Sequence, residues 1–371
     1  MTPATPDVIV VGAGVVGAAC AEALAEAGCR VSILESAFPG AGVTGAAMGH
    51  LVVMDDSEAQ FALTAHSRRL WSERTAALPG ELEDDACGTL WVAADDDEMA
   101  HVRTKAAYYR ARGEPVEVLD AVALRDAEPQ LRDGLVGALR VAGDRVVYPP
   151  AAARFFLERA RAAGASVELG VRVEALAARR VLCAGRWREA DLIVNAAGPE
   201  APRLTPGLPI VPRRGHLVIT DRYPGFLHHQ VVELGYLRSA HTLTRESVAM
   251  NVQPRKTGQL LVGSSRELVD WDASLNRPLL ARMLHRASEF LPALPRLLAL
   301  RTWTGFRPAT PDKLPLVGMW EPGLWVAAGH EGLGVTTAPG TARLLADLVL
   351  GRVPALDPLP FDPRREMPAH G

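Results

Sequence analysis

The sequence has few of the features that mark disulfide-rich, zinc-binding or nucleic-acid-binding proteins. Its four cysteines, Cys20, Cys29, Cys87 and Cys183, form no Cys-x-x-Cys pair. We therefore expect buried reduced thiols and neither a disulfide framework nor a zinc site. The formal net charge is −3, and arginine-rich spots such as Arg179-Arg180 stay short. This charge pattern argues against a nucleic-acid partner, which would require a basic stripe.

Long hydrophobic runs are also missing. No uninterrupted apolar stretch approaches the ~18 residues of a membrane span. The first six residues are too few and too weakly charged to begin a signal peptide. We therefore expect a cytoplasmic protein with at most peripheral contact to the inner membrane. No Ser-His-Asp arrangement, metal-ligand cluster, paired-carboxylate signature or internal repeat stands out, so we expect no bound metal.

The beginning of the chain carries a strand that leads into a glycine loop. Val8-Ile9-Val10-Val11 is followed by Gly12-Ala13-Gly14-Val15-Val16-Gly17. In such a loop, Gly12 permits the tight turn and Gly14 lets a diphosphate approach the main chain. Gly17 lets the next helix pack on the strand. The spacing predicts a cradle for the pyrophosphate of a dinucleotide.

The elements after the loop complete a βαβ unit. A helix expected over about residues 18–27 points its positive N-terminal end at the phosphates. A second apolar run at residues 30–34 then delivers Glu35. An acidic residue roughly 20 positions past the glycines can accept hydrogen bonds from a ribose diol. Strand, loop, helix, strand and acid in this order predict dinucleotide binding, whereas a glycine loop alone is a weak signal.

The chain has 371 residues, which is more than one compact core usually holds. Residues 213–270 alternate apolar and polar side chains, which is typical of an antiparallel sheet. We expect an α/β fold in which a Rossmann-type nucleotide domain carries an inserted α+β domain on an antiparallel sheet. The nucleotide domain is expected over residues 1–80, 145–212 and 300–371, and the inserted domain over residues 81–144 and 213–299.

Further expectations concern single elements. Residues 171–176 are expected to form a strand beside a strand at residues 164–169. Residues 192–198 read as a buried strand ending on small residues, which suits close approach to a ligand. A turn at residues 332–335 is expected to lead into a helix over about residues 338–350. The proline-rich tail from Pro354 is expected to be extended.

These segments together resemble the flavin amine oxidoreductases of the D-amino acid oxidase superfamily. Glycine oxidase, sarcosine oxidase and the proline and hydroxyproline dehydrogenases belong there. The resemblance covers nearly the whole chain. It rests on Gly12, Gly14, Gly17 and Glu35, on the small residues between Pro39 and Gly49, and on Asn195-Ala196-Ala197-Gly198, Val211-Pro212-Arg213-Arg214-Gly215-His216, Gly305-Phe306-Arg307-Pro308 and Gly329-His330-Glu331-Gly332-Leu333-Gly334.

A narrower resemblance concerns two later segments. His229-Gln230-Val231-Val232-Glu233-Leu234-Gly235-Tyr236 and Asn251-Val252-Gln253-Pro254-Arg255 are most similar to catalytic subunits of D-hydroxyproline dehydrogenases. Hydrogen cyanide synthase and opine oxidase subunits are near relatives of these.

The superfamily resemblance implies FAD as the cofactor and assigns residues to each of its parts. It places Val173 at the adenine and Thr44 to His50 along the ribityl chain and the isoalloxazine. It places Gly332 to Thr336 at the flavin N1–C2=O edge, where fixed dipoles stabilise the charge of the reduced flavin. The implied cofactor residues are Gly12, Gly14, Val15, Val16, Gly17, Glu35, Ser36, Thr44, Gly45, Ala47, Met48, Gly49, His50, Val173, Ala197, Gly198, Gly305, Arg307, Gly332, Leu333, Gly334, Val335 and Thr336.

We expect the FAD to be held noncovalently. Some relatives attach FAD through a histidine or a cysteine. Ala46 stands where one subgroup has its histidine, and residues 306–313, where another has its cysteine, contain none.

The same resemblance names the residues at the substrate. Arg307 corresponds to an arginine that pairs with the substrate carboxylate, and a planar guanidinium can bind a carboxylate bidentately. Tyr236 could donate its hydroxyl to the same carboxylate or be a core tyrosine. His50 and His330 flank the expected flavin, where each either touches substrate or hydrogen-bonds backbone. His228 and His229 read as loop histidines.

The implied activity is oxidation of the C–N bond of a small amino or imino acid by hydride transfer to flavin N5. D-Hydroxyproline or D-proline, giving a cyclic imine carboxylate, is the leading substrate. One alternative is a glycine or sarcosine oxidase that produces hydrogen peroxide. Another is an FAD-carrying subunit of a heteromeric dehydrogenase that is inactive alone.

The electron acceptor is inferred from one position. Sarcosine-oxidase-type relatives use a lysine near the flavin to promote reaction with oxygen. Gapless matching of that strand to Gln259-Leu260-Leu261-Val262-Gly263 puts Leu261 in its place, and a leucine cannot stabilise developing superoxide. The match could be off by a residue, or another cation such as Lys256 or a protonated His50 could substitute. We expect a dehydrogenase that passes electrons to a partner subunit or a quinone.

Overall fold

The computed structural model describes residues 5–235 and 246–367. It divides into two compact units, each made of separate stretches of chain. Unit 1 comprises Met1–Leu82, Tyr148–Pro212 and Phe306–Gly371, and unit 2 comprises Glu83–Val147 and Arg213–Gly305.

Unit 1 is built on a six-stranded sheet with the strand order β18-β19-β12-β1-β2-β8. Its strands are β1 (Asp7–Val11), β2 (Arg30–Glu35), β8 (Ser166–Leu169), β12 (Leu192–Asn195), β18 (Leu316–Glu321) and β19 (Leu324–Ala328). All neighbours pair in parallel except β18 with β19. The apolar runs in β1 and β12 suit central strands buried on both faces. This sheet confirms the Rossmann-type expectation.

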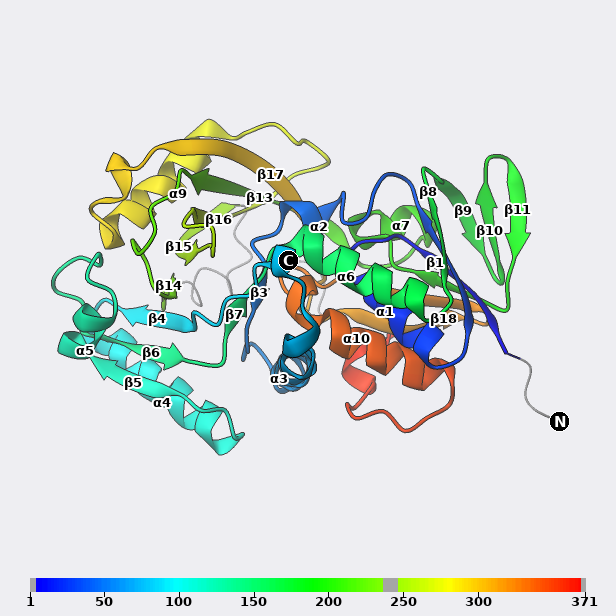
Figure 1. Ribbon diagram of the computed structural model, residues 1–371, viewed down its shortest axis with the longest axis horizontal. Helices are drawn as coiled ribbons and strands as arrows, with labels where there is room; N and C mark the ends of the chain where they lie inside the picture. Colours follow the sequence, from blue (N-terminus) through cyan, green and yellow to red (C-terminus); the bar gives the residue numbers. More distant parts are fainter. Residues whose placement is uncertain (1–4, 236–245, 368–371) are drawn as a thin grey trace. The chain divides into compact units, whose positions relative to one another are not determined.

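Helices cover this sheet. They are α1 (Val15–Glu26), α3 (Glu58–Glu73), α6 (Pro149–Ala162) and α10 (Gly334–Val349), with the shorter α2 (Val43–Ala46) and α7 (Ala201–Leu204). Figure 1 shows α1 between α6 and α10, and α3 packs on α10. Helix α1 begins at Val15, before the expected residue 18, so Gly17 lies in its first turn.

A separate three-stranded sheet contradicts the expected pairing of residues 171–176. Strand β9 (Val173–Ala177) pairs with β10 (Arg180–Cys183), which pairs with β11 (Arg186–Glu189), while β8 pairs with β2. The chain leaves β8 through Gly170, whose φ of +74° turns it sharply. Val173 and Val181 then join a buried cluster with Ile193. Burial of these side chains therefore determines the partner of β9.

Helix α10 begins at Gly334, four residues before the expected start, and Pro339 lies inside it. Proline favours the first helical turn, so Pro339 taken by itself suggests a later start. The carbonyl of Val335, four residues before Pro339, instead accepts a hydrogen bond from the indole Nε1 of Trp71 at 3.1 Å. A side chain from another helix therefore compensates for the missing N–H.

The end of the chain also differs from the expected extended tail. Leu359–Phe361 form a 3-10 turn, and Phe361 is buried. Arg365 forms an ion pair with Asp312 at 2.7 Å. Burial of Phe361 and this ion pair hold the tail against unit 1.

Unit 2 is built on an eight-stranded sheet with the order β17-β13-β16-β15-β14-β4-β6-β5. Its strands are β4 (Thr89–Ala93), β5 (Glu117–Asp120), β6 (Gly137–Val141), β13 (Val211–Thr220), β14 (Gln230–Glu233), β15 (Glu246–Pro254), β16 (Leu260–Leu268) and β17 (Ala299–Ala309). From β13 to β5, neighbouring strands pair antiparallel, except β14 and β4, which pair in parallel. The expected antiparallel sheet is thus confirmed, and β17 continues into residues of unit 1.

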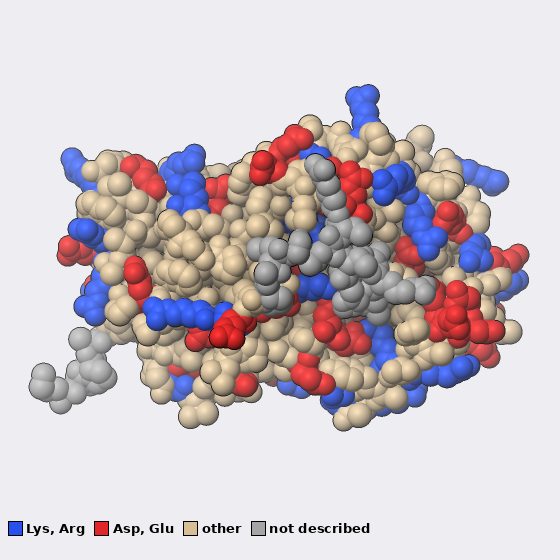
Figure 2. All heavy atoms as spheres, turned by 180° about the vertical axis from the view of Figure 1, so that it is seen from behind, with Lys and Arg blue, Asp and Glu red and all other residues tan. Residues whose placement is uncertain are grey.

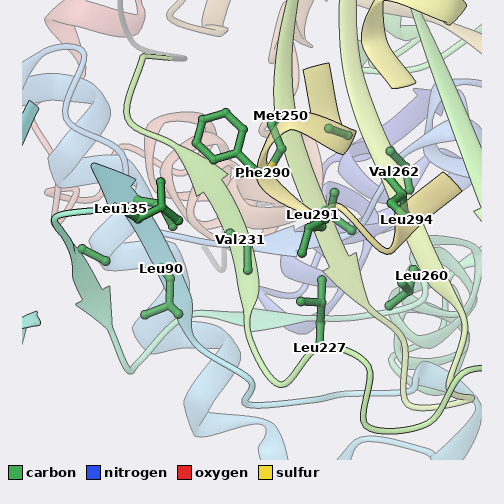
Figure 3. Packing of buried hydrophobic residues seen from close by; sticks show 14 of the residues in the cluster. Leu90, Leu135, Leu227, Val231, Met250, Leu260, Val262, Phe290, Leu291 and Leu294 are labelled. Carbon is green, nitrogen blue, oxygen red and sulfur yellow. The ribbon is translucent and has the colours of Figure 1, made fainter. Parts of the chain in front are cut away.

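One face of this sheet packs against helices α5 (Ala121–Ala127) and α9 (Arg277–Phe290). Figure 3 shows Val231, Met250 and Val262 from three strands pointing toward Phe290 and its neighbours. Alternation along the strands sends Asn251, Gln253 and Leu261 to the opposite face. The remaining elements are α4 (Asp96–Ala111), β3 (His50–Leu51) and β7 (Arg145–Val146).

In the described part of the chain, no helix combines the length and the apolar character needed to cross a bilayer. The surface charges are mixed. On the face drawn in Figure 2, Lys and Arg side chains are interspersed with Asp and Glu side chains.

Candidate functional site

The glycine loop between β1 and α1 has three glycines with different reasons for lacking a side chain. Gly12 has a φ of +103°, and a Cβ there would lie 2.7 Å from the carbonyl oxygen of Ala196. A Cβ at Gly17 would lie 2.1 Å from the carbonyl oxygen of Gly12. Packing within the protein therefore requires both glycines.

Gly14 is different. Its φ is −64°, which any residue adopts, and its nearest neighbour to a built Cβ is the Thr44 hydroxyl at 3.3 Å. No backbone atom of the protein excludes a side chain there. Gly14 therefore leaves space at the N-terminus of α1, as the approach of a ligand to this loop requires.

The amides at the start of α1 are partly used by the protein itself. The N–H of Val15 donates to the Thr44 hydroxyl at 3.0 Å. The N–H of Ala18 donates to the carbonyl of Gly14, which is the first intrahelical bond. The amides of Val16 and Gly17 have no intrahelical acceptor, because they lie in the first turn. An anion at this terminus would therefore meet Val16 and Gly17 more readily than Val15.

Glu35 closes the other side of the loop. Its Oε2 accepts from the N–H of Ala13 at 2.8 Å, and its Oε1 accepts from the N–H of Ala37 and the hydroxyl of Ser36. A carboxylate has about four acceptor positions, and these three donors leave one of them, on Oε2, for a ribose hydroxyl. Glu35 therefore braces the loop and keeps one acceptor position for the ribose that the sequence predicts.

The stretch of small residues between Pro39 and Gly49 lies at the N-terminus of α1, where Thr44 accepts from Val15. Thr44 and Gly45 lie on α2, and a Cβ at Gly45 would lie 2.8 Å from the carbonyl oxygen of Gly40. Gly49 has a φ of +95°. Met48 is buried and Ala47 is half-buried. His50 follows on β3, and its carbonyl accepts from the Thr336 hydroxyl at 2.7 Å.

A second glycine loop precedes α10. A Cβ at Gly334 would lie 3.8 Å from Val16 Cγ2, so this loop lies next to the start of α1. A Cβ at Gly332 would lie 3.7 Å from Nε of Arg307, so the guanidinium side chain lies against the same loop. Leu333 is the N-cap of the helix, and Val335 and Thr336 are in its first turn. Two helix N-termini and one arginine therefore converge in unit 1.

Five further expected residues remain, and one of them, Ala197, lies beside the glycine loop, with its Cα 3.4 Å from a Cβ built at Gly12. The N–H of Ala197 donates to the side chain of Asn195, and Gly198 follows with a φ of +59°. The carbonyl of Val173 accepts from Arg203 at 3.1 Å. Gly305 is the last residue of unit 2. Tyr236 lies outside the described residues.

His330 is buried, and its Nε2 lies 3.0 Å from the Thr341 hydroxyl. Burial lowers the pKa of His330 to about 3, so the ring is neutral near pH 7. This partner and this burial favour a structural role over contact with substrate.

The buried neutral imidazole makes unfolding sensitive to acid. The unfolded residue takes up a proton near its ordinary pKa of 6.5, whereas the folded one does so only near 3. Stability from this group is therefore lost as pH falls below 6.5, by about 2 kcal/mol between pH 7.5 and pH 5. We expect His330→Gln to reduce the difference between urea-unfolding free energies at these two pH values by that amount. His285→Gln, at a side chain that is 79% exposed, should leave the difference unchanged.

Two contributors were missed by sequence reasoning. Thr44 was expected only to line a ligand, yet its hydroxyl also accepts from the start of α1. Trp71 was not among the expected site residues, yet its indole donates to carbonyls in the first turn of α10. The proline at position 339 is the sequence signal that a carbonyl in this helix needs an outside donor.

Comparison with known proteins agrees with this architecture. Residues 7–348 match the family model described as FAD dependent oxidoreductase. The chain is 30% identical to glycine oxidase of Geobacillus kaustophilus over 97% of each protein. It is 27% identical to the hydrogen cyanide synthase subunit HcnC of Pseudomonas aeruginosa over 98% of this chain and 97% of that one. The crystal structure of the Geobacillus glycine oxidase has a TM-score of 0.87 at 28% identity, covering 98% of this chain and all of that one.

The residues present fit the cofactor that this family carries. Gly14 leaves room at the N-terminus of α1, and the start of α10 lies next to it. Both termini offer N–H groups to negatively charged parts of a dinucleotide, and Glu35 offers an acceptor position to a ribose hydroxyl. By sequence, by fold and by this cradle, the chain belongs to the family of FAD-dependent oxidoreductases that act on the C–N bonds of amino groups.

Proposed function

We propose that the protein oxidises the C–N bond of a small cyclic D-imino acid, D-hydroxyproline or D-proline, to a cyclic imine carboxylate. FAD-dependent amine oxidation follows from the family. The observation that carries the proposal further is the side chain of Arg307, which lies against the second glycine loop beside Gly332. In the proposal, unit 1 holds FAD noncovalently.

Arg307 is proposed to anchor the substrate. A guanidinium binds a carboxylate through two parallel hydrogen bonds and so fixes its orientation as well as its position. FAD, when bound, supplies the acceptor for the hydride that leaves the substrate carbon. The contribution of the chain is to hold the substrate in one orientation and to exclude water, and such positioning supplies much of a rate enhancement.

The proposal for a cyclic imino acid is supported by the resemblance of two segments of unit 2, residues 229–236 and 251–255, to D-hydroxyproline dehydrogenases. They form the neighbouring strands β14 and β15, in which Val231 pairs with Val252 and Val232 with Asn251. Two of their ionisable side chains serve the fold, because His229 pairs with Glu128 and Glu233 pairs with Arg286. Val232, Asn251 and Gln253 lie on the face of the sheet opposite the hydrophobic cluster. In the proposal, residues on this face contact the substrate.

The substrate is tested by anaerobic bleaching of the bound flavin. The panel comprises D- and L-proline, both 4-hydroxyproline epimers in both configurations, sarcosine and glycine. We expect the D-configured cyclic compounds to reduce the flavin at the lowest concentrations. Preferential reduction by glycine or sarcosine would replace this proposal with the oxidase alternative.

Two alternatives have their own support. Relatives named glycine oxidase favour glycine as substrate. The relative HcnC is named as a subunit, which favours a heteromeric dehydrogenase. Gel filtration of the isolated chain, followed by the bleaching panel, separates these. If substrate bleaches the flavin of the isolated monomeric chain, the chain is active without partner subunits, and the reading as an inactive subunit is excluded.

The electron acceptor is proposed to be a partner subunit or a quinone and not oxygen. Leu261 is buried on β16, between Ile219 of β13 and Gln253 of β15. Reduced enzyme mixed with air-saturated buffer in a stopped-flow should reoxidise slowly, and an artificial dye should accept electrons faster. We expect Leu261→Lys to speed the reaction with oxygen at least about tenfold, because a cation stabilises developing superoxide.

Lys256 provides the control for this experiment. It lies between β15 and β16, and its Nζ is 3.4 Å from the carbonyl oxygen of Asp84. Lys256→Met should leave reoxidation unchanged. Rapid reoxidation of the unaltered enzyme with stoichiometric hydrogen peroxide would show that it is an oxidase.

A further inference from the structure

Helix α10 has an internal proline close to its N-terminus. A helical residue normally donates its N–H to the carbonyl four residues earlier, and proline has no N–H. Pro339 therefore cannot donate to the carbonyl of Val335. This carbonyl is in the first turn of the helix, directly after the glycine loop that contacts Arg307.

Trp71 of α3 supplies the missing donor. Its indole Nε1 lies 3.1 Å from the carbonyl oxygen of Val335 and 3.1 Å from that of Thr336. The ring is 1% exposed and packs edge-on against Phe156, with the centroids 5.0 Å apart. A side chain packed in this way has one orientation, so its N–H direction is fixed.

The contact between the two helices continues for another turn. The hydroxyl of Ser67 lies 3.5 Å from the carbonyl oxygen of Thr337. A Cβ at Gly340 would lie 2.2 Å from that hydroxyl oxygen. Gly340 thus lets α3 approach closely enough for Trp71 to reach the backbone of α10.

A hydrogen bond to a carbonyl acts on the N–H at the other end of the same peptide group. The carbonyl of Val335 shares its peptide with the N–H of Thr336. That N–H is in the first turn, so it has no intrahelical acceptor and points out of the helix N-terminus. Donation to the carbonyl polarises the peptide and makes its N–H a stronger donor. Trp71 therefore strengthens the N–H of Thr336 by donating to the carbonyl at the other end of the same peptide.

We propose that Trp71 is a positioning residue for the flavin. By holding the peptide between Val335 and Thr336, it orients and strengthens the N–H groups that stabilise negative charge on the reduced cofactor. The inference rests on the part of the proposed function that places residues 332–336 at the flavin, and it is independent of the substrate.

The test is the reduction equilibrium of the purified holoenzyme against reference dyes. Trp71→Phe keeps an aromatic ring, though a smaller one, and removes the N–H. At a fixed dye potential, we expect its ratio of reduced to oxidised flavin to fall roughly threefold to tenfold, the range expected for one hydrogen bond. Titration of the Trp71→Phe apoprotein with FAD should give a higher Kd than titration of the unaltered apoprotein. Trp325→Phe is the matched control, since the Trp325 indole nitrogen is buried without a hydrogen-bond partner in the described part of the chain.

A second variant supplies the donor in another way. In Trp71→Phe/Pro339→Ala, the new N–H of residue 339 can donate to the carbonyl of Val335. We expect this double variant to recover part of the lost reduction equilibrium. An unchanged equilibrium in Trp71→Phe, with only a lower Tm, would show that Trp71 merely packs and would overturn the inference.

Gly332→Ala separates this inference from the placement of the flavin. A Cβ there meets no protein atom closer than 3.7 Å, so it would disturb a ligand and not the fold. A shift in FAD affinity or reduction equilibrium in Gly332→Ala but not in Trp71→Phe refutes the role of Trp71 alone. No shift in either variant refutes the placement of residues 332–336 at the flavin.

Discussion

Replacing Gly14 by valine is expected to give a folded but colourless protein. Gly14 has a φ of −64° and no backbone neighbour that a Cβ would strike, so the fold can accept the change. The branched side chain would fill the space at the start of α1 that a diphosphate needs. We expect absorbance near 450 nm to be lost and apoprotein titration to show at least about a hundredfold weaker FAD binding, while far-ultraviolet circular dichroism is retained.

Two other glycines serve as controls. Gly17→Ala places a Cβ 2.1 Å from the carbonyl oxygen of Gly12, so it should lower the Tm of the apoprotein as well as its affinity for FAD. Gly80→Val lies in unit 1 where a Cβ meets no atom within 4 Å, so it should stay yellow. A fully flavinylated Gly14→Val protein would refute the placement of the pyrophosphate.

Replacing Arg307 by lysine is expected to leave the flavin bound and to slow turnover strongly. Lysine keeps the charge but offers a point donor in place of a planar fork. Loss of the bidentate pair should cost about 2–4 kcal/mol of transition-state stabilisation, which is roughly a 30- to 1,000-fold fall in kcat/KM. Steady-state kinetics with the best substrate of the bleaching panel measure this.

Arg301 provides the matched control on the same strand. It is exposed on β17, and its guanidinium lies 5.4 Å from the ring centroid of Trp303. Arg301→Lys should change kcat/KM by less than about twofold, as surface substitutions usually do. An unchanged kcat/KM in Arg307→Lys would remove Arg307 from the substrate site.

The parallel core of unit 1 was predictable because its signals are local. Val8-Ile9-Val10-Val11 and residues 192–194 are apolar runs that suit buried strands, and glycines mark the turn after the first. The alternation in residues 213–270 likewise predicted antiparallel strands. Each of these patterns concerns a few neighbouring residues and one burial requirement.

The start of α10 was not predictable, because it depends on a residue far away in the sequence. Pro339 argues for a later start unless a donor reaches Val335, and that donor is Trp71, 264 residues earlier. The partner of β9 was missed for a related reason. A strand shows which of its faces is apolar, but the turn at Gly170 and the burial of Val173 beside Ile193 together decide which sheet it joins.

In the candidate site too, features set by neighbouring residues were predictable and features set by distant packing were not. Spacing identified Gly12, Gly14 and Gly17, but only the structure separates the two glycines that packing requires from the one that leaves space. Sequence could not decide whether His330 contacts a ligand or the protein interior, and burial beside Thr341 favours the interior. Glu128 was not considered, although its buried carboxylate accepts from both His228 and His229.

The order of strands in unit 1 has a consequence for synthesis of the chain on the ribosome. Strand β1 pairs with β12, and β12 pairs with β19, so the centre of the sheet cannot close before residue 328 has emerged. Until then β12 offers an unpaired edge, a site of aggregation in nascent chains. The two glycine loops meet only when α10 has followed. The proposed cradle can therefore form only after the start of α10 at Gly334 has emerged, and a polypeptide that stops short of β19 lacks one of its two helix N-termini.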